Sequence, residues 1–198
     1  MKLYEFAPTR SARCRWTLLE LGLDFTSIAD SSLIGSAELK RIHPMGKLPA
    51  MVIDGKPLFE SAAICTYLAD SHPEAGLIAP PGSWDRALHD QWVSFALTEL
   101  EAWLWSNARH TFIYPEEKRI PAIFEPNGEE VNKAAAVLDA ALADSDYLVA
   151  NTFSVTDIIV AYAVDWARRQ KLLAGCVNLD SYLQRLFARE HCTLGRGD

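Results

Sequence analysis

No run of apolar residues in this sequence is long enough to cross a membrane, and its first residues lack the apolar core of a secretory signal. Cysteine is scarce: four residues are scattered along the chain, with no CxxC pair and no spacing to histidine that is typical of zinc. From these absences we expect a cytoplasmic protein with free thiols and no metal.

Basic residues are outnumbered by acidic ones, 19 to 26, which gives a formal net charge of −7. This charge argues against nucleic acid or an anionic membrane as the main partner, so an anionic ligand would have to be attracted by local groups. Hydrophobic residues at 49% and charged residues at 23% are typical of a globular chain. A length of 198 residues suffices for one large domain or two small ones.

The first eighty residues alternate strand and helix signals. A helix over 11–21 is expected to end at Gly22, and the Asp54-Gly55 pair predicts a tight turn between two strands. The order β-α-β-α-β-β-α is that of a thioredoxin-like domain, in which the first two strands are parallel. The predicted strands are 2–6, 25–28, 50–53 and 57–59, and the predicted helices are 11–21, 36–42 and 61–70.

The pattern changes after a stretch rich in proline and glycine, 72–84, which is typical of a linker. Apolar periodicity then predicts helices over 85–109, 127–143, 155–171 and 179–189 and therefore an all-α bundle. The segment 114–126, with three prolines, is expected to be irregular and to serve as a lid or a connector. We thus predict two domains, residues 1–77 and 84–198.

One predicted helix has a clear capping signal at its start. Ser154 and Asp157 have the spacing of a capping box, and Phe153 and Ile158 stand at the staple positions around it. A catalytic role for Asp157 is the alternative, but the capping pattern favours a structural one. Its replacement is expected to cost about 1 kcal/mol of stability.

Two short motifs indicate a ligand site. Gly46-Lys47-Leu48-Pro49 precedes the predicted hairpin, and a Leu-Pro bond there is a good candidate for the cis form. Glu60-Ser61 lies where a strand gives way to an apolar helix. Together they would offer one edge of backbone and one helix N-terminus to a small, extended, anionic ligand.

The chain resembles the glutathione transferases over nearly its whole length. The resemblance rests on residues 3–25, 42–70 and 153–169, in that order and at those spacings, and is to bacterial theta- or beta-like members of the Ser/Thr type. It implies an α/β thioredoxin-like N-terminal domain that binds glutathione, followed by an all-α helical bundle that forms the electrophile site. It also implies a homodimer, glutathione as co-substrate without a metal, and a role in detoxification.

The same resemblance assigns the residues that would hold glutathione. The backbone of Leu48, before the cis-proline Pro49, would pair with the cysteinyl part like an added strand. Glu60 would bind the γ-glutamyl ammonium and Ser61 its carboxylate, and Lys47 would meet the glycyl carboxylate. The alternative for Lys47 is a solvated turn lysine.

The resemblance also implies a group near the start of the first helix that stabilises the glutathione thiolate. Ser11 is our leading candidate and Thr9 is close behind, although Ser11 is equally expected as a helix N-cap. Arg10 occupies the position of the beta-class cysteine, which argues against a thiol-based mechanism. Arg10 or Arg13 would add positive potential beside the sulfur.

The sequence offers further candidate positions. Glu99 resembles a beta-class glutamate that reaches glutathione bound by the partner subunit, but a solvated or paired charge is equally expected. His43 stands where most members have asparagine, and we favour local backbone capping over a catalytic role. An aromatic group near the end of the long helix suits a flat apolar co-substrate or the bundle core: Trp103, Trp105, Phe112 and Tyr114.

We therefore expect a glutathione transferase that activates the thiolate for attack on an apolar or aromatic small molecule. The alternatives are a glutathione-dependent peroxidase, isomerase or dehalogenase, or a non-catalytic interaction protein with the same fold. The presence of Leu48-Pro49, Glu60-Ser61 and two hydroxyls favours an enzyme.

Overall fold

The computed structural model describes residues 1–195 of the 198, so the last three residues of the predicted helical domain lie outside the described residues. Its N-terminal part contains a four-stranded sheet in the order β2-β1-β3-β4. Strands β1 (Lys2–Tyr4) and β2 (Thr26–Ile28) are parallel, as predicted, while β3 (Ala50–Ile53) and β4 (Lys56–Phe59) form an antiparallel hairpin. The turn residues Asp54 and Gly55 both have positive φ, at 49° and 77°, which confirms the tight turn.

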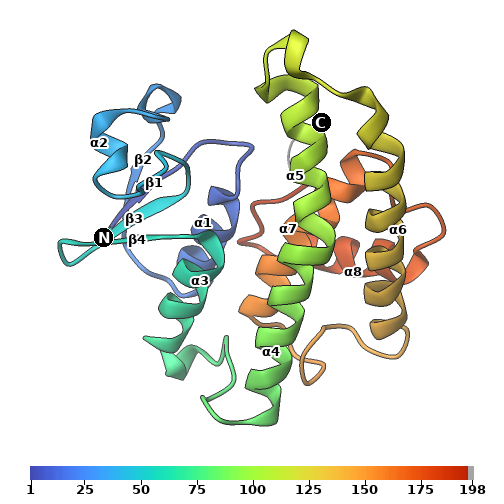
Figure 1. Ribbon diagram of the computed structural model, residues 1–198. Coiled ribbons are helices and arrows are strands. Elements are labelled where there is room, and N and C mark those ends of the chain that lie inside the picture. The colour runs from blue at the N-terminus through green and yellow to red at the C-terminus, as the bar shows by residue number, and fades with distance from the viewer. Residues whose placement is uncertain (196–198) are drawn as a thin grey trace.

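Helices cover both faces of this sheet. Successive side chains of a strand point to opposite faces, so neighbouring residues of one strand contact different helices. Leu3 and Met51 belong to the core formed with α1 (Ser11–Glu20) and α3 (Ser61–Asp70). Tyr4 and Ala50 pack with Leu39 of α2 (Ala37–Lys40) on the other face. Figure 1 shows α1 and α3 on the side of the sheet that faces the helical part.

The predicted long helix is present but not uniform. It consists of α4 (Trp84–Phe95), a π-helical stretch (Ala96–Glu101), α5 (Ala102–Ala108) and a second π-helical stretch (Arg109–Ile113). Three further helices follow: α6 (Phe124–Ala141), α7 (Val155–Arg169) and α8 (Val177–Phe187). In Figure 1, α4 and α5 run as one rod beside α6.

The prediction for 114–126 was wrong in part. Single 3₁₀ turns form at Glu116–Lys118 and Pro121–Ile123, and α6 begins at Phe124, before Pro126. A proline in the first turn of a helix removes only an N–H that has no helical partner, so Pro126 did not mark the boundary.

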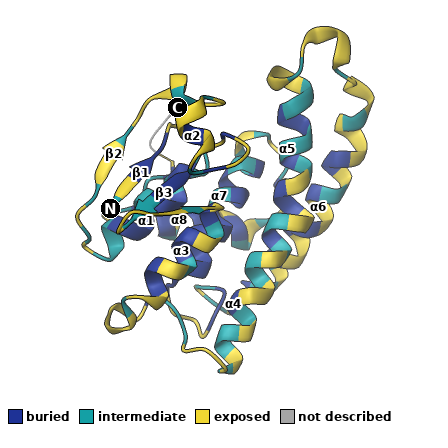
Figure 2. Ribbon diagram, turned by 60° about the vertical axis from the view of Figure 1, so that its left-hand side comes forward, coloured by how far each residue is buried: buried dark blue, intermediate teal, exposed yellow. Residues whose placement is uncertain are grey.

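Helix α7 is the centre of the molecule, and eleven of its fifteen residues are buried (Figure 2). It packs against α1 and α3 of the N-terminal part and against α4, the π-helical stretch Ala96–Glu101 and α8 of the helical part. Two hydrogen bonds tie the N-terminal part to it: Val155 N–H donates to Leu77 O at 2.8 Å, and Arg13 Nε donates to Ile159 O at 2.9 Å. The two parts therefore share one continuous core.

The capping box at the start of α7 is confirmed. The Ser154 hydroxyl accepts from Thr156 N at 3.3 Å, and the Ser154 amide donates to Asp157 Oδ2 at 2.9 Å. None of the four cysteines, all of which lie within the described residues, forms a disulfide. None of the helices in the described part is long and apolar enough to cross a membrane. The fold is an α/β thioredoxin-like N-terminal part followed by an all-α bundle, as the sequence predicted.

Candidate functional site

A cavity of about 310 Å³ lies where the N-terminal part meets the long helix. Five of the predicted site residues line it: Lys47, Leu48, Pro49, Glu60 and Ser61. The other lining residues come from the start of α1, the loop before β3 and the long helix: Arg10, His43, Leu97, Glu101, Ala102 and Trp105.

The loop that carries Leu48 and Pro49 is fixed by a close backbone contact. Gly46, at φ 61°, accepts a hydrogen bond from Gly35 N–H at 2.9 Å, and a Cβ on Gly46 would lie 2.9 Å from the Gly35 Cα. Only glycine fits this contact. The Leu48–Pro49 bond is cis, as predicted, and leads directly into β3.

Glu60 and Ser61 are held in an unusual backbone geometry. Glu60 has φ 72° and ψ 113°, a conformation that costs a non-glycine residue energy and that is typically found at functional sites. It presents the start of α3, whose first amides have no helical partner. Ser61 is buried, and its hydroxyl accepts a hydrogen bond from Arg13 Nη1 at 3.2 Å. The cavity thus has a carboxylate, a hydroxyl and a helix N-terminus side by side.

A buried carboxylate links the two parts of the chain at this cavity. Glu101 is 4% exposed and binds both Arg10, which precedes α1, and Arg13 of α1. Burial by itself raises the pKa of Glu101, but the two arginines outweigh burial and lower it. Glu101 is therefore ionised at neutral pH and neutralises one of the two guanidinium groups.

Aromatic rings fix the cations at the cavity. The Arg10 guanidinium lies 5.0 Å from the ring centroid of Trp105 and 5.4 Å from that of Trp166. Lys47 Nζ lies 5.8 Å from the Trp105 ring. Lys47 is exposed, and its ammonium is within reach of a cation–π contact with Trp105.

The two hydroxyls proposed for thiolate stabilisation bind each other. Thr9 Oγ1 and Ser11 Oγ are 2.6 Å apart, and the Thr9 hydroxyl also accepts from Ser11 N–H at 3.3 Å. Ser11 is 2% exposed, and neither residue is among those that line the cavity. The N-cap interpretation of Ser11 was wrong: Arg10 precedes the helix, and the Ser11 hydroxyl accepts from Phe6 N–H at 3.4 Å.

Two other predicted positions have clear surroundings. His43 is buried, and its Nδ1 accepts from Met45 N–H at 3.2 Å, which confirms the local capping role. Burial also lowers the pKa of His43, with Lys47 in support and Glu60 opposing. Glu99 is exposed and outside the cavity lining, and its carboxylate accepts from the neighbouring Thr98 hydroxyl at 3.0 Å.

The four aromatic residues predicted near the end of the long helix have different surroundings. Trp105 lines the cavity, whereas Trp103 packs against the core. Phe112 is 65% exposed, and Tyr114 packs edge-on against His110. Among the described residues, Trp105 is thus the only one of these four aromatics at the site.

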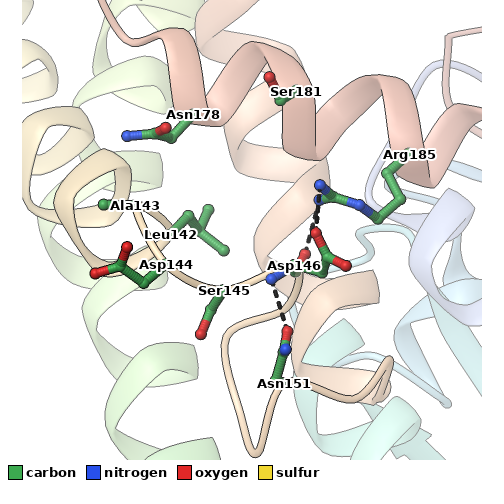
Figure 3. A pocket seen from close by; sticks show the side chains of 9 residues that line it. All are labelled: Leu142, Ala143, Asp144, Ser145, Asp146, Asn151, Asn178, Ser181 and Arg185. Atoms are coloured by element: carbon green, nitrogen blue, oxygen red, sulfur yellow. Dashed lines mark hydrogen bonds and ion pairs between the residues drawn. The ribbon is translucent and has the colours of Figure 1, made fainter.

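A second cavity of about 310 Å³ lies elsewhere, between the end of α6, the loop that follows it and α8 (Figure 3). Its lining is mostly polar, and its one basic side chain, Arg185, is already paired with Asp146 at 2.6 Å. Asp146 N–H also donates to Asn151 at 2.6 Å. None of the residues predicted from the sequence to bind a ligand lines it.

Sequence reasoning missed Glu101. It also missed that Glu101 pairs with both Arg10, which lines the cavity, and Arg13, which is buried. A signal was present: Glu101 stands in a row at spacing four with Leu97 and Trp105, so a charge interrupts an apolar face. The spacing of Arg10 and Arg13 likewise puts both on one face of α1.

Comparison with known proteins identifies the family. The glutathione S-transferase N-terminal domain model matches residues 1–70, and the C-terminal domain model matches residues 102–190. The chain is 29% identical over 195 residues to glutathione S-transferase GstA of Escherichia coli O157:H7, covering 96% of this chain and 94% of that protein. It is 26% identical over 197 residues to glutathione S-transferase GST-4.5 of Xanthomonas campestris, covering 95% of this chain and 93% of that protein.

A solved structure agrees with these relatives. The sphingomonad glutathione S-transferase complexed with glutathione superposes with a TM-score of 0.84 at 27% identity, covering 97% of this chain and 95% of that chain. The two family models together span most of the sequence and correspond to its α/β and all-α parts. The chain belongs to the glutathione S-transferase family.

Proposed function

We propose that the protein is a glutathione transferase that activates the thiol of glutathione for attack on an apolar or aromatic electrophile. The thiol proton passes to solvent, and the thiolate forms a sulfur–carbon bond while the leaving group departs with its electron pair. The observation that carries this proposal is the convergence of Lys47, Leu48, Pro49, Glu60 and Ser61 on one cavity. The family membership and the relative complexed with glutathione support it.

The chemistry of the cavity suits glutathione. In this proposal the backbone of Leu48 pairs with the cysteinyl part, because an extended peptide binds well to a free backbone edge. Glu60 accepts the γ-glutamyl ammonium, and Ser61 with the first amides of α3 binds the carboxylate. Lys47 meets the glycyl carboxylate. No metal takes part in this scheme.

We assign thiolate stabilisation to the Thr9–Ser11 pair at the start of α1. Two hydroxyls that share one hydrogen bond retain one free proton between them, and that proton can be donated to sulfur. The half-exposed Thr9 and the buried Ser11 are 2.6 Å apart, so loss of either hydroxyl also disturbs the other. The N-terminus of α1 adds a favourable dipole.

The electrophile is assigned to the side of the cavity formed by the long helix. Trp105, Leu97 and Ala102 supply an apolar wall with one large ring, which favours a flat apolar molecule. Such a reaction would serve detoxification in the cytoplasm. Peroxide reduction, isomerisation and dehalogenation use the same activated thiolate, and a screen that includes peroxides separates peroxide reduction from transfer.

We further propose that the chain acts as a homodimer of two-domain subunits, with domains at 1–77 and 84–198. The edge strand β4 and helix α3 carry the exposed aromatic residues Phe59 and Tyr67, which would be covered in a dimer. Glu99, exposed on the long helix, would reach glutathione bound by the partner subunit. Light scattering after gel filtration tests the dimer.

The experiment that tests the function is a titration with reduced glutathione, followed by thiolate absorbance as a function of pH. We expect saturable binding and a bound thiol pKa below that of free glutathione. A screen of uncharged halogenated nitroaromatics and peroxides then identifies the reaction. No binding, or binding with an unchanged thiol pKa, would refute the proposal.

A further inference from the structure

Two arginines lie near the start of α1, and the structure distinguishes them. Arg13 is fully buried, and all three of its nitrogens are used: Nε binds Ile159 O, Nη1 binds Ser61 Oγ and Nη2 binds Glu101. The Arg10 side chain is 27% exposed and lines the cavity. Its Nε binds Glu101, and neither terminal nitrogen forms a hydrogen bond with another described residue. Arg10 alone of the two has donors to offer a ligand.

We propose that Arg10 is a catalytic residue whose guanidinium contacts the sulfur of bound glutathione and holds it as the thiolate. This inference rests on the proposed function and extends it, since the hydroxyl pair of Thr9 and Ser11 is the only sulfur contact assigned there. The step is a proton loss alone: the thiol proton passes to water, and no electron is transferred.

The charge balance of the cluster supports this role. Glu101 is one negative charge between two arginines, so the group of three carries a net charge of +1. Arg13 has no surface exposure, so the uncompensated charge is presented to the cavity through Arg10. The other titratable residues that line the cavity are Lys47, Glu60 and His43. Burial disfavours the protonated form of His43 and lowers its pKa, while Lys47 and Glu60 offset each other in charge.

The position of Arg10 at the start of α1 also suits a contact with the glutathione sulfur. It directly precedes α1, so it follows Thr9 in the chain and stands beside the Thr9–Ser11 pair. The guanidinium contacts Trp105, Trp166 and Glu101, so little further ordering is needed when a ligand binds. A guanidinium is weakly hydrated compared with an ammonium, which reduces the cost of displacing water when sulfur enters.

The test is the pKa of the bound glutathione thiol in the full-length protein, measured by thiolate absorbance for wild type, Arg10→Gln and Arg10→Lys. An opposite charge within contact distance lowers a pKa by about 1 to 3, so Arg10→Gln is expected to raise the bound thiol pKa by at least about 1. Transfer to an uncharged nitroaromatic at neutral pH should fall about tenfold, and the loss should shrink as the pH is raised. The matched control is Arg41→Gln, which removes an exposed arginine outside the cavity lining and should leave the thiol pKa unchanged.

Each outcome decides the inference. If wild type lowers the thiol pKa and Arg10→Gln lowers it equally, Arg10 is not the stabilising cation, although the proposed function stands. If wild type itself leaves the thiol pKa unchanged, the proposed function fails and the inference fails with it. If Arg10→Gln does not fold, Arg10→Lys decides: a pKa within about 0.5 of wild type supports a cation at this position, and a return to the value of free glutathione overturns it.

Discussion

Replacement of Asp157 is predicted to have an effect on stability that depends on pH. Its side chain is fully buried and accepts four hydrogen bonds: from Leu148 N–H at 3.1 Å, Ser154 N–H at 2.9 Å, Ser154 Oγ–H at 3.2 Å and Tyr182 O–H at 3.0 Å. Burial nevertheless outweighs these donors and raises the pKa of Asp157 from 3.8 to about 6. The folded state therefore binds a proton to this carboxyl at a pH where the unfolded chain does not.

The magnitude follows from this difference. Because the folded pKa lies above the unfolded one, stability is lost as pH rises between them, and a pKa difference of one is worth about 1.4 kcal/mol. The rise from 3.8 to about 6 thus costs the folded protein about 3 kcal/mol above pH 6 relative to pH below 4. Of this, about 1.4 kcal/mol is expected between pH 5 and pH 7.5.

The perturbation is Asp157→Asn, which cannot ionise. An asparagine keeps one acceptor oxygen but places an NH₂ toward Ser154 N–H, which costs about 1 to 3 kcal/mol for the unmade bond. We therefore expect Asp157→Asn to be destabilising at acidic pH and to recover relative to wild type as the pH is raised. At pH 7.5 the substitution should be close to neutral.

The assay is denaturant unfolding of both proteins at a series of pH values, with the difference in unfolding free energy taken at each pH so that other titrating groups cancel. The control is Asp144→Asn, at an exposed loop aspartate, for which the difference should not vary with pH. Tyr182→Phe removes one donor to the carboxylate. It should therefore raise the pKa of Asp157 further and steepen the loss of stability with rising pH. A difference between wild type and Asp157→Asn that stays flat from pH 5 to pH 7.5 would refute the reasoning.

Three further predictions concern the cavity. Ser61→Ala should raise the KM for glutathione about tenfold with little change in kcat, because the lost bond is made equally in the ground and transition states; steady-state kinetics showing a fall in kcat alone would contradict this. Lys47→Met should raise the same KM about two- to fivefold at low salt, and the gap should close as salt is added, since the lysine is exposed and its charge is screened. Glu101→Gln leaves the buried Arg13 without a carboxylate and should lower the unfolding free energy by about 3 to 5 kcal/mol. Glu99→Gln, the exposed control, should change the unfolding free energy by less than about 0.5 kcal/mol in the absence of glutathione. A loss for Glu101→Gln no larger than that for Glu99→Gln would show that the buried ion pair contributes nothing to stability.

The comparison of Glu99 with Glu101 shows where sequence reasoning reached its limit. Residues two apart on a helix lie about 200° apart around its axis, so only one of the two faces the cavity. The choice depends on the π-helical stretch Ala96–Glu101, which rotates the residues that follow it relative to a regular α-helix. No propensity marks such a stretch, and resemblance pointed to Glu99 while the buried carboxylate is Glu101.

Other parts were predictable because local chemistry decides them. The turn at Asp54-Gly55 and the capping box at Ser154 each depend on residues within a few positions, and both formed as expected. The start of α6 was misplaced because Pro126 is tolerated in a first helical turn as well as in a loop, so the proline alone could not locate the boundary.

The cavity exists only where the two parts of the chain pack together, and Glu101 explains how that packing and the chemistry are joined. An unpaired buried guanidinium is strongly unfavourable, so Arg13 of α1 fixes Glu101 of the long helix opposite it. Once the carboxylate is held there, it orients Arg10, and Trp105 one turn further along the same helix packs against that arginine. The ion pair therefore does more than stabilise an interface: it sets which cation faces the cavity and which is hidden beneath it. A hydrophobic replacement of all three residues would preserve the packing but leave the cavity without a fixed positive charge at the start of α1, which accounts for a charged cluster at a position where apolar side chains would serve stability equally well.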